Sequence, residues 1–370
     1  MPYTFVMAGG GTGGHVFPAL AVARVLKERG HRSAFIGTRE GMESRLVPEA
    51  GFEIQFIRIG GLKRVGLRKQ IQTVVLLPAS IASAWRLLGR LRPDAVFSMG
   101  GYVAGPAMAA ALLRRIPLVV MEPNAIPGFA TRKVARWIYR ALVGFDSTRA
   151  WFPAGKCEVT GLPIRPEFFR IPPKREGTFT VLITGGSRGA RTLNRASRES
   201  WDLFRKSEAP VRIVHQTGAT EHESLREAFS SAGIEGTVLP FIEDMPKAFS
   251  ETDLVVARAG AGSVNEIAAA GMASVLVPLP FAADDHQGKN AEALVEASAA
   301  RMVLDREMNG QRLFQEVEAL RQNPWELDRM RARVRQFARP GAAERAADVL
   351  EEAALSRKNQ IRAAKGSFAH

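Results

Sequence analysis

Short apolar runs alternate with longer stretches of helical periodicity along almost the whole chain. Tyr3–Ala8 and Phe179–Thr184 are runs of this kind, and each leads into a glycine-rich turn and then into a helical stretch. Eight further runs predict strands: Ser33–Ile36, Ala95–Ser98, Pro117–Met121, Leu142–Val143, Val211–His215, Thr237–Pro240, Leu254–Ala257 and Ser274–Val277. Strands that alternate with helices of about 10–15 residues are typical of βαβ units in a parallel sheet. The pattern therefore predicts the α/β class, with two doubly wound, Rossmann-like domains that each open on a glycine turn.

The division of the chain follows from proline, glycine and the end of the periodic pattern. We place the domain boundary near Gly161–Arg165, just before a proline-rich stretch. A last helix is predicted over Ala342–Ala354, after a break at Pro340 and Gly341, and Ser356–His370 has no apolar periodicity, so we expect a frayed tail. Three parts are expected: residues 1–163 as the first Rossmann-like domain, 164–340 as the second, and 341–370 as a helix and tail that pack back on the first.

Composition narrows the class of protein. Of the 370 residues, 46% are hydrophobic and 24% are charged, which excludes a largely disordered chain. The single cysteine, Cys157, excludes an internal disulfide and a thiolate zinc cluster, so we expect a reducing compartment. The N-terminus has no basic segment before a long apolar run, and the apolar stretches Val74–Trp85 and Tyr102–Leu113 are shorter than the ~20 residues of a membrane span. We therefore expect a soluble or peripheral protein without a secretory signal.

The net charge of +14 is concentrated in the first half of the chain. Residues 1–163 hold 22 basic and 9 acidic side chains, a net of +13, whereas residues 164–370 hold 29 and 28, a net of +1. Between residues 54 and 93 there are eight Lys or Arg and no acidic residue. Such an asymmetry indicates an anionic partner for the first domain: nucleic acid, a membrane surface or a phosphorylated substrate.

The two glycine turns are candidate anion sites, because a helix N-terminus offers unpaired N–H groups and partial positive charge. Gly9–Gly14 matches G-x-G-x-x-G, but a dinucleotide site also needs an acid at the tip of the second strand, about 20 residues on. Here that strand runs into Thr38 and Arg39, and Glu40 lies beyond its tip. A tight turn needed only for packing is the alternative. Gly185–Ala190 lacks the motif but adds the Ser187 hydroxyl, so two ligand-binding loops are expected.

Seven segments carry distinctive combinations of glycine, proline and polar residues. They are Gly9–Val22, Gly100–Pro106, Glu122–Gly128, Gly185–Asn194, Phe241–Met245, Ala257–Glu266 and Asp285–Ala291. In this order, over about residues 3–350, they resemble the family of UDP-N-acetylglucosamine–N-acetylmuramyl-(pentapeptide) pyrophosphoryl-undecaprenol N-acetylglucosaminyltransferases. The resemblance implies the GT-B fold, in which two Rossmann-like domains face a cleft. It also implies inverting transfer of N-acetylglucosamine from UDP-N-acetylglucosamine to the C4 hydroxyl of lipid I in peptidoglycan biosynthesis.

Two other functions remain open at this point. One is a GT-B UDP-sugar transferase with a soluble acceptor. The other is a basic scaffold that binds nucleic acid or a membrane and holds no reactive ligand. Against nucleic acid, the chain has no recognised RNA- or DNA-binding module and no aromatic platform between its charges.

Two residues of the first domain are candidates for the base that such a transfer needs. His15 directly follows the first glycine turn, and imidazole titrates near neutral pH; capping or packing at the helix start is its alternative role. Glu122 ends an apolar strand, where a carboxylate faces the ligand-binding edge of a parallel sheet. The sequence leaves the choice between them open. Asn124 suits sugar hydroxyls or turn formation. By the resemblance, a diphosphate is contacted by Thr12, Gly13 and Gly14.

The resemblance implies that the second domain binds UDP-N-acetylglucosamine. Ser187 would hold the diphosphate, and Arg165 would lie near the nucleotide. Ile242 would present its backbone to uracil, and Gln287 would bind hydroxyls of N-acetylglucosamine. Glu266 would accept from the ribose hydroxyls, although it also follows Ser263 at the spacing of a capping box. The other nucleotide contacts implied are Ala261, Gly262 and Ser263.

No cofactor and no metal site of the protein are expected. Asp284 and Asp285 are adjacent and do not form the D-x-D motif that binds a metal in the other large glycosyltransferase fold. A diphosphate can still attract Mg²⁺ from solution.

Residues 62–92 form a basic segment with an apolar stripe at helical spacing. The stripe consists of Val75, Ala79, Ala82 and Trp85, and the cations include Lys63, Arg64, Arg68 and Lys69. Tryptophan beside lysine and arginine is typical of a segment that lies at a membrane interface, although a core-facing helix is the alternative. Each basic residue near an anionic leaflet contributes about 1 kcal/mol. We therefore expect a peripheral protein on the cytoplasmic face of the bacterial inner membrane, with an anionic lipid surface as partner.

Overall fold

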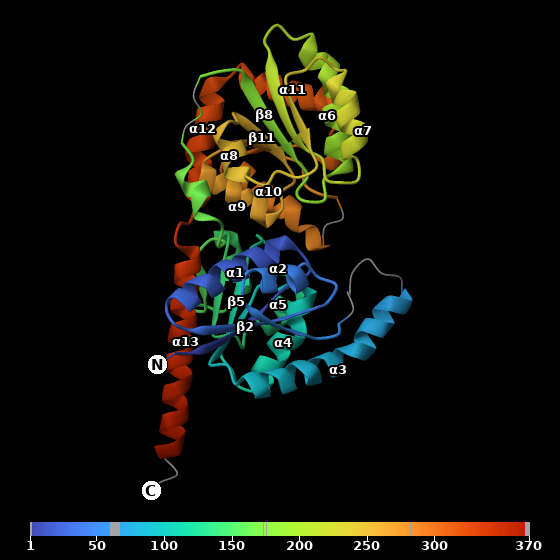
Figure 1. The fold of residues 1–370 in the computed structure, drawn as a ribbon. Coiled ribbons are helices and arrows are strands. Elements are labelled where there is room, and N and C mark those ends of the chain that lie inside the picture. Colours follow the sequence, from blue (N-terminus) through green and yellow to red (C-terminus); the bar gives the residue numbers. More distant parts are fainter. Residues whose placement is uncertain (1, 60–66, 173, 175, 281–282, 367–370) are drawn as a thin grey trace. The chain divides into compact units, whose positions relative to one another are not determined.

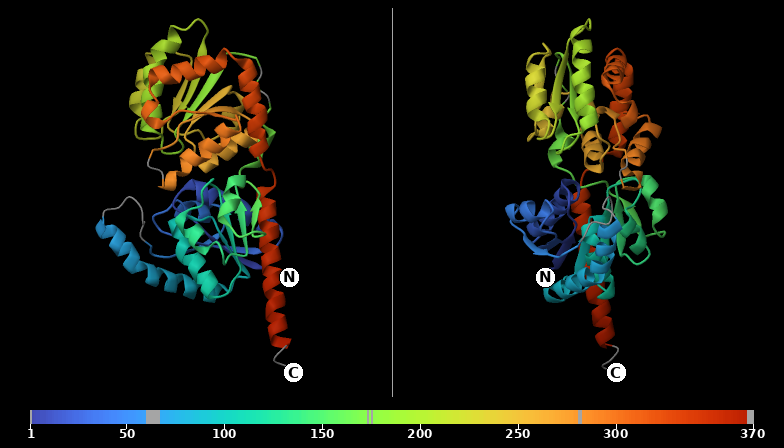
Figure 2. Two further views of the ribbon diagram at one scale, coloured as in Figure 1. Left: turned by 180° about the vertical axis from the view of Figure 1, so that it is seen from behind. Right: turned by 90° about the vertical axis from the view of Figure 1, so that its right-hand side faces the viewer.

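The computed structural model describes residues 2–59, 67–172, 174, 176–280 and 283–366. The chain forms two compact units (Figure 1). The first unit consists of Met1–Ile164 together with Gly341–His370, and the second unit of Arg165–Pro340. Each unit has one parallel sheet with helices on its two faces (Figure 2), so the predicted doubly wound α/β class is confirmed.

The sheet of the first unit has seven parallel strands in the order β3-β2-β1-β4-β5-β6-β7. Their bounds are β1 Thr4–Ala8, β2 Arg32–Gly37, β3 Glu53–Phe56, β4 Ala95–Ser98, β5 Leu118–Glu122, β6 Arg140–Val143 and β7 Cys157–Val159. The predicted strands agree with these bounds to within two residues. The sequence missed β3 and β7, because these outer strands are only partly buried and carry no continuous apolar run.

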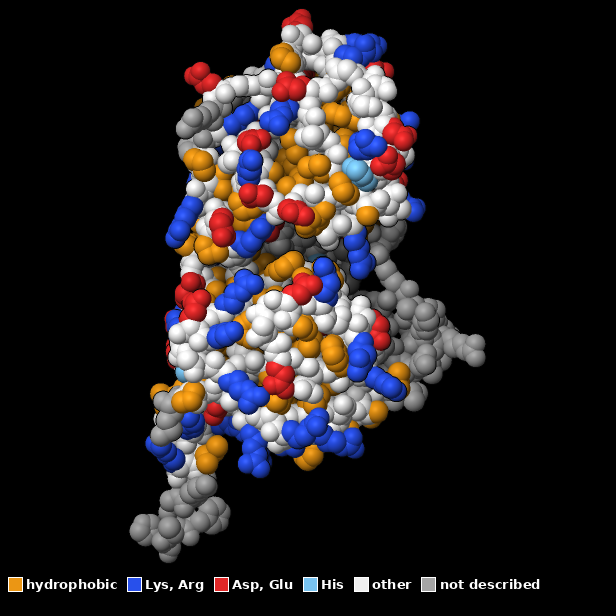
Figure 3. Space-filling view, viewed as in Figure 1, with side chains coloured by type: hydrophobic (Ala, Val, Ile, Leu, Met, Phe, Trp, Pro, Cys, Tyr) orange, Lys and Arg blue, Asp and Glu red, His pale blue; other side chains and the backbone are white. Residues whose placement is uncertain are grey.

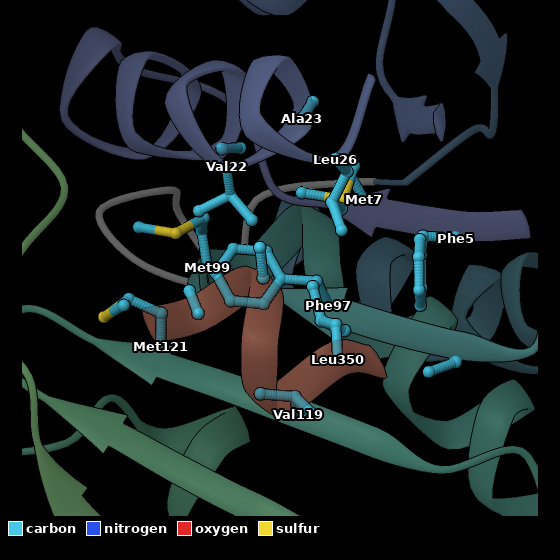
Figure 4. Packing of buried hydrophobic residues seen from close by; sticks show 14 of the residues in the cluster. Phe5, Met7, Val22, Ala23, Leu26, Phe97, Met99, Val119, Met121 and Leu350 are labelled. Atoms are coloured by element: carbon cyan, nitrogen blue, oxygen red, sulfur yellow. The ribbon is translucent and has the colours of Figure 1, made fainter. Parts of the chain in front are cut away.

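Helices cover both faces of this sheet because successive side chains of a strand point to opposite faces. In β1, Phe5 and Met7 belong to one core, and Val6 and Ala8 to the other. The first core is covered by α1 (Gly13–Glu28), α2 (Glu43–Glu49) and α13 (Ala342–Gly366), and the second by α3 (Leu67–Leu91) and α4 (Gly101–Leu113). Figure 4 shows the first of these cores, where Leu26 of α1 packs near Met7. Two short helices complete the unit: α5 (Phe129–Val134) and the 3₁₀ helix η1 (Asp146–Trp151).

The C-terminal helix α13 packs on the first unit although it follows the second unit in the chain. Leu350 lies in the same core as the residues of α1. At the rim, Arg345 donates to both carboxylate oxygens of Glu158 at 2.7 and 2.9 Å. The expectation that the chain frays from Ser356 is wrong as far as Gly366, because α13 continues to that residue; residues 367–370 lie outside the described part of the chain. The first residues of this extension have tertiary contacts: Arg357 donates to the carbonyl of Pro93, and the Lys358 ammonium lies over the Tyr3 ring, whereas residues 359–363 are exposed.

The second unit repeats the architecture with six parallel strands in the order β10-β9-β8-β11-β12-β13. Their bounds are β8 Phe179–Thr184, β9 Val211–Gln216, β10 Gly236–Leu239, β11 Leu254–Ala257, β12 Ala273–Leu276 and β13 Arg301–Met302. Its α-helices are α6 Arg191–Arg205, α7 His222–Ser230, α8 Met245–Ser250, α9 Ala261–Ala270, α10 His286–Glu296, α11 Gly310–Arg321 and α12 Pro324–Val334. The 3₁₀ helices are η2 Pro166–Arg170, η3 Ala283–Asp285, η4 Asp305–Glu307 and η5 Arg335–Phe337.

One core of the second unit joins four of these helices to the sheet. Val181 and Ile183 of β8 pack there with residues of α6, α7, α11 and α12. Among the strands of this unit within the described residues, the sequence missed only β13, which has two residues.

None of the helices in the described part of the chain has the length and apolar character needed to cross a membrane.

Candidate functional site

The motifs of the first unit meet at the carboxyl edge of its sheet. The strand order reverses between β1 and β4, which are neighbours in the sheet, and ligands of doubly wound sheets bind at such a point. The glycine loop Gly9–Thr12 follows β1, and Gly100 and Gly101 follow β4 with φ of +72° and +77°. Four of the predicted site residues lie in the loop after β1 and the first turn of α1: Thr12, Gly13, Gly14 and His15.

His15 is placed in the first turn of α1, three residues after Thr12, which is the N-cap. Thr12 Oγ1 lies 3.2 Å from His15 Nδ1. The turn after β4 is on the Nε2 side of the ring, where a Cβ added to Gly101 would lie 3.7 Å from Nε2. The partly buried imidazole is therefore held by a hydroxyl on one nitrogen and lies at the point where the strand order reverses.

Glu122 is the last residue of β5, and its side chain is only 3% exposed. Its Oε1 accepts from the Asn124 backbone N–H at 3.2 Å and from Asn124 Nδ2 at 3.1 Å, and its Oε2 accepts from the Gly128 N–H at 3.0 Å. Burial raises the pKa of the carboxyl to about 7, and these hydrogen bonds oppose the rise. The carboxylate thus holds its own loop, residues 122–128, and Asn124 is part of the same network.

This pKa gives Glu122 a measurable effect on stability. In the unfolded chain the carboxyl titrates near 4.5, so between pH 4.5 and 7 the folded protein holds a proton that the unfolded chain has released. The stabilisation is complete below pH 4.5 and is lost as pH rises through 7, by about 3 kcal/mol at most. We expect the urea midpoint of the wild type to fall between pH 5 and 8 more steeply than that of Glu122→Gln. Equal slopes for the two proteins would contradict the assignment.

The glycine loop of the second unit, Gly185–Ala190, has a closely packed backbone. It follows β8, which neighbours β11 where the strand order reverses, and α6 begins after it. Gly189 has φ +71°, and an added Cβ would overlap the carbonyl of Thr217. Ser187 is exposed in the turn of this loop. The predicted diphosphate-binding residue is therefore accessible on a loop whose backbone is closely packed.

The helix α9 begins after β11, on the other side of the same point. Gly260 is its N-cap, so Ala261, Gly262 and Ser263 form the first turn, whose backbone N–H groups have no partner within the helix. The capping-box alternative for Ser263 and Glu266 is wrong, because Ser263 lies inside the helix and the cap position is occupied by a glycine. This finding removes the structural explanation for Glu266 that the sequence left open.

Glu266 and Arg165 interact within the second unit. Burial raises the pKa of Glu266 to about 7, and the positive charge of Arg165 opposes the rise. Arg165 is exposed, and its guanidinium lies 5.1 Å from the centre of the buried Phe168 ring. A carboxyl that titrates near neutral pH beside an exposed cation can bind hydroxyl groups of a polar ligand and respond to pH.

The other two predicted residues of this unit have hydrogen-bonded partners. The Ile242 N–H donates to Gln216 Oε1 at 2.8 Å, and the Leu279 N–H donates to Gln287 Oε1 at 2.9 Å. Gln216, which the sequence did not single out, is buried at the end of β9 and also donates to the carbonyl of Gly186 at 2.9 Å. It connects the glycine loop to the segment of Ile242.

Glu43 in the first unit is the second residue that the sequence missed. It is fully buried and accepts from the Gly11 N–H at 2.7 Å. A dinucleotide site requires an acidic residue about 20 residues after the glycine loop. Glu43 comes 29 residues after Gly14, so this criterion did not identify it. Its position at the start of the short helix α2 carried no recognisable signal.

The basic segment lies only partly within the described residues. Lys63 and Arg64 fall outside them, and Arg68, Lys69 and Val75 are described only as backbone of α3. Ala79, Ala82 and Trp85 are exposed, and the buried side of this part of α3 carries Ala84, Leu87 and Leu88. The part of the stripe whose side chains are described, from Ala79 to Trp85, is thus not a core face. Trp85 is 44% exposed, and Arg114 lies 3.8 Å from the centre of its ring.

The described residues contain no cluster of three or more His, Cys, Asp or Glu side chains that could hold a metal ion.

Comparison with known proteins gives a consistent result. The glycosyltransferase family 28 N-terminal domain matches residues 5–143, and the family 28 C-terminal domain matches residues 180–349. A UDP-N-acetylglucosamine--N-acetylmuramyl-(pentapeptide) pyrophosphoryl-undecaprenol N-acetylglucosamine transferase of Solibacter usitatus is 58% identical over 95% of this chain and 96% of its own. The enzyme of the same description from Myxococcus xanthus is 39% identical over 93% and 91%.

Solved structures agree with the family match. The crystal structure of Acinetobacter baumannii MurG superposes with a TM-score of 0.78 at 36% identity, covering 95% of this chain and all of that one. The predicted GT-B fold is thereby confirmed, as is the resemblance drawn from the seven motifs. The chain belongs to glycosyltransferase family 28, among the UDP-N-acetylglucosamine--N-acetylmuramyl-(pentapeptide) pyrophosphoryl-undecaprenol N-acetylglucosamine transferases.

Proposed function

We propose that this protein transfers N-acetylglucosamine from UDP-N-acetylglucosamine to the C4 hydroxyl of undecaprenyl-diphospho-N-acetylmuramoyl-pentapeptide, converting lipid I to lipid II in peptidoglycan biosynthesis. The observation that carries this proposal is the 58% identity, over 95% of the chain, to a transferase whose description names this donor and acceptor. The two glycine loops, each at the point where a strand order reverses, supply the kind of anion-binding surface that a nucleotide diphosphate and a lipid diphosphate need.

The donor binds to the second unit in this proposal. Ser187 and the N–H groups of Ala261, Gly262 and Ser263 approach the diphosphate, and Arg165 adds a positive charge near the nucleotide. The Ile242 N–H is engaged by Gln216, so uracil would meet the backbone carbonyl of Ile242. Gln287 has its oxygen engaged by Leu279, so a sugar hydroxyl would meet its NH₂ group. Negative charge that develops on the departing UDP is stabilised by these donors.

Glu266 accepts hydrogen bonds from the ribose hydroxyls in its ionised form. Since its pKa is about 7, lowering the pH from 8 to 6 protonates most of it and removes the acceptor. We expect the Kd for UDP-N-acetylglucosamine to rise about tenfold over this range in the wild type, by linkage to one group. The dissociation constant of Glu266→Gln stays nearly independent of pH. Calorimetric titration with UDP-N-acetylglucosamine is the appropriate measurement, because free UDP has a phosphate group that titrates in the same range. A tenfold rise in both proteins would contradict this role.

His15 is the base in this proposal. To take the proton of the acceptor hydroxyl at Nε2, the imidazole must carry its own proton on Nδ1, and Thr12 Oγ1 at 3.2 Å can accept from that N–H. Glu122 is the less suitable candidate, because both of its oxygens accept hydrogen bonds from its own loop. Asn124, Gly13 and Gly14 would contact substrate groups at the same edge. Mg²⁺ can accompany the diphosphate from solution without a site of its own on the protein.

Transfer of radiolabelled N-acetylglucosamine to a lipid I analogue tests the function. Label should move into the lipid-soluble product only when both the protein and the analogue are present. A soluble muramyl pentapeptide without the lipid diphosphate serves as the comparison. Equal transfer to both acceptors would favour the alternative, a family 28 transferase with a soluble acceptor.

We also propose that the protein acts on the cytoplasmic face of the bacterial inner membrane, attached peripherally. An anionic surface suits the first half of the chain, which has a net charge of +13, with 22 basic and 9 acidic residues. Figure 3 shows lysine and arginine side chains spread over the visible face of the first unit. Exposed Trp85 beside Arg114 is the kind of pair that anchors a protein at a lipid interface.

Vesicle binding tests this attachment. We expect replacement of Lys63, Arg64, Arg68 and Lys69 with alanine to reduce sedimentation with anionic vesicles at least about tenfold, because each cation contributes about 1 kcal/mol near such a surface. Replacing four cations of the second unit, Arg195, Arg205, Arg226 and Lys289, is the matched control and should change little. Unchanged binding of the first variant would contradict the role of the basic segment.

A further inference from the structure

Glu43, the first residue of α2, is a fully buried carboxylate bonded to the first glycine loop. Its Oε2 accepts from the Gly11 N–H at 2.7 Å. Its Oε1 accepts from the N–H and from the hydroxyl of Thr38, both at 2.8 Å. The two oxygens therefore connect the loop after β1 to the end of β2. Burying a carboxylate is unfavourable unless it is hydrogen-bonded, so these bonds are needed for it to remain inside.

Three glycines make room for this carboxylate. A Cβ added to Gly10, Gly37 or Gly41 would overlap the side chain of Glu43. Glycine at these three places, one of them in the loop itself, lets the backbone approach the carboxyl group as closely as a bound ligand would. The first glycine loop is thus wrapped around an anion that belongs to the protein.

The loop segment held in this way leads directly to the candidate catalytic residues. Gly11, whose N–H is bonded to Glu43, has φ +87° and precedes Thr12, the N-cap of α1. Thr12 in turn contacts His15 through its hydroxyl. We propose that Glu43 is a positioning residue: by occupying the Gly11 N–H it fixes the backbone that places Thr12 and His15, and it keeps a diphosphate away from that N–H.

In the second unit, the glycine loop is held by a neutral side chain instead of a carboxylate. Gln216, at the end of the strand next to β8, donates to the carbonyl of Gly186 in the second loop. An amide that binds a loop carbonyl adds no negative charge, so this loop keeps its attraction for an anion. A carboxylate inside the first loop reduces that attraction. The difference favours the second loop for the donor diphosphate and leaves the Gly11 N–H to orient His15, while Gly13 and Gly14 in the first turn of α1 keep the substrate contacts proposed above.

The variant E43Q tests this role at nearly constant volume. Its amide has one acceptor instead of two, so it cannot accept from both Thr38 and Gly11, and its NH₂ group opposes one of the two N–H donors. We expect kcat for transfer to lipid I analogue to fall about tenfold or more, because small displacements of a reacting group lower rates strongly. The KM for UDP-N-acetylglucosamine stays within about twofold, because the donor binds to the other unit.

Thr38→Val is the matched control. It removes one hydrogen bond of the same buried cluster but leaves the bond between Glu43 and Gly11. We expect its melting temperature to fall while its kcat stays within about twofold of the wild type. The inference is overturned if E43Q keeps wild-type kcat, or if Thr38→Val loses kcat to the same extent.

The expected loss of kcat in E43Q rests on the proposed function. A second measurement therefore distinguishes a failure of this inference from a failure of the proposed function. Amide hydrogen exchange, followed by mass spectrometry, should be faster in E43Q than in the wild type across residues 9–16 and unchanged across residues 185–190. Unchanged exchange across residues 9–16 overturns the inference whatever the activity. A wild-type protein without transfer activity, but with this exchange difference in E43Q, would contradict the proposed function alone.

Discussion

Replacing His15 with alanine is expected to lower the rate of transfer about 10²–10⁴-fold, which is the usual contribution of a general base. The acceptor hydroxyl then loses the group that, in the proposed function, takes its proton. Binding of UDP-N-acetylglucosamine stays unchanged, because the donor is held by the second unit. The measurements are single-turnover transfer to a lipid I analogue and calorimetric titration with the donor.

Two further variants separate a base from a packing residue. His15→Asn can keep a polar contact with Thr12 but cannot take up a proton, so it should be as slow as the alanine variant while melting closer to the wild type. Glu122→Gln keeps much of the hydrogen bonding of its loop and should transfer within about tenfold of the wild type. If Glu122→Gln loses the larger factor and His15→Ala does not, Glu122 is the base.

Replacing Gly189 with alanine is expected to destabilise the second unit by about 3 kcal/mol or more and to abolish donor binding. Two effects add: the residue has φ +71°, which an L side chain adopts unfavourably, and its Cβ would overlap the carbonyl of Thr217. The loop after β8 cannot retain its shape against this contact. Urea unfolding and calorimetric titration with UDP-N-acetylglucosamine measure the two consequences.

Gly186→Ala separates the backbone strain from the overlap. Gly186 lies in the same loop with φ +81°, but a Cβ there has nothing within 4 Å. Its replacement should cost only the strain of the left-handed conformation, about 1–2 kcal/mol. Equal destabilisation by the two substitutions would show that the close approach to Thr217 has no energetic effect.

Local sequence patterns were sufficient to predict most of the strands of the fold. A strand in the middle of a parallel sheet is buried on both faces, so Leu254–Ala257 and Ala95–Ser98 appear as apolar runs, and the structure has the same bounds. The outer strands β3 and β7 have partly polar, half-buried residues, and their pairing depends on the neighbouring strand rather than on their own sequence.

The candidate site could be predicted where a motif is local. The glycine loops and the residues directly after them, such as His15 and Ser187, follow from the geometry of a strand that ends before a helix. Their neighbours across the sheet could not be predicted. Glu43 and Gln216 lie on the strands or helices that adjoin each loop, 32 and 30 residues away from the loop residues that they bond.

The α/β class, the two glycine loops, the family and the concentration of positive charge in the first half of the chain could all be predicted from the amino-acid sequence. These features depend on residue types within short segments, or on ordered motifs. Four other features became visible only in the folded chain: Glu122 holds its own loop, Ser263 lies inside α9, α13 continues to Gly366, and Glu43 occupies the first glycine loop. Each of these depends on burial or on hydrogen bonds set by how the backbone folds, which residue types in a short segment do not specify.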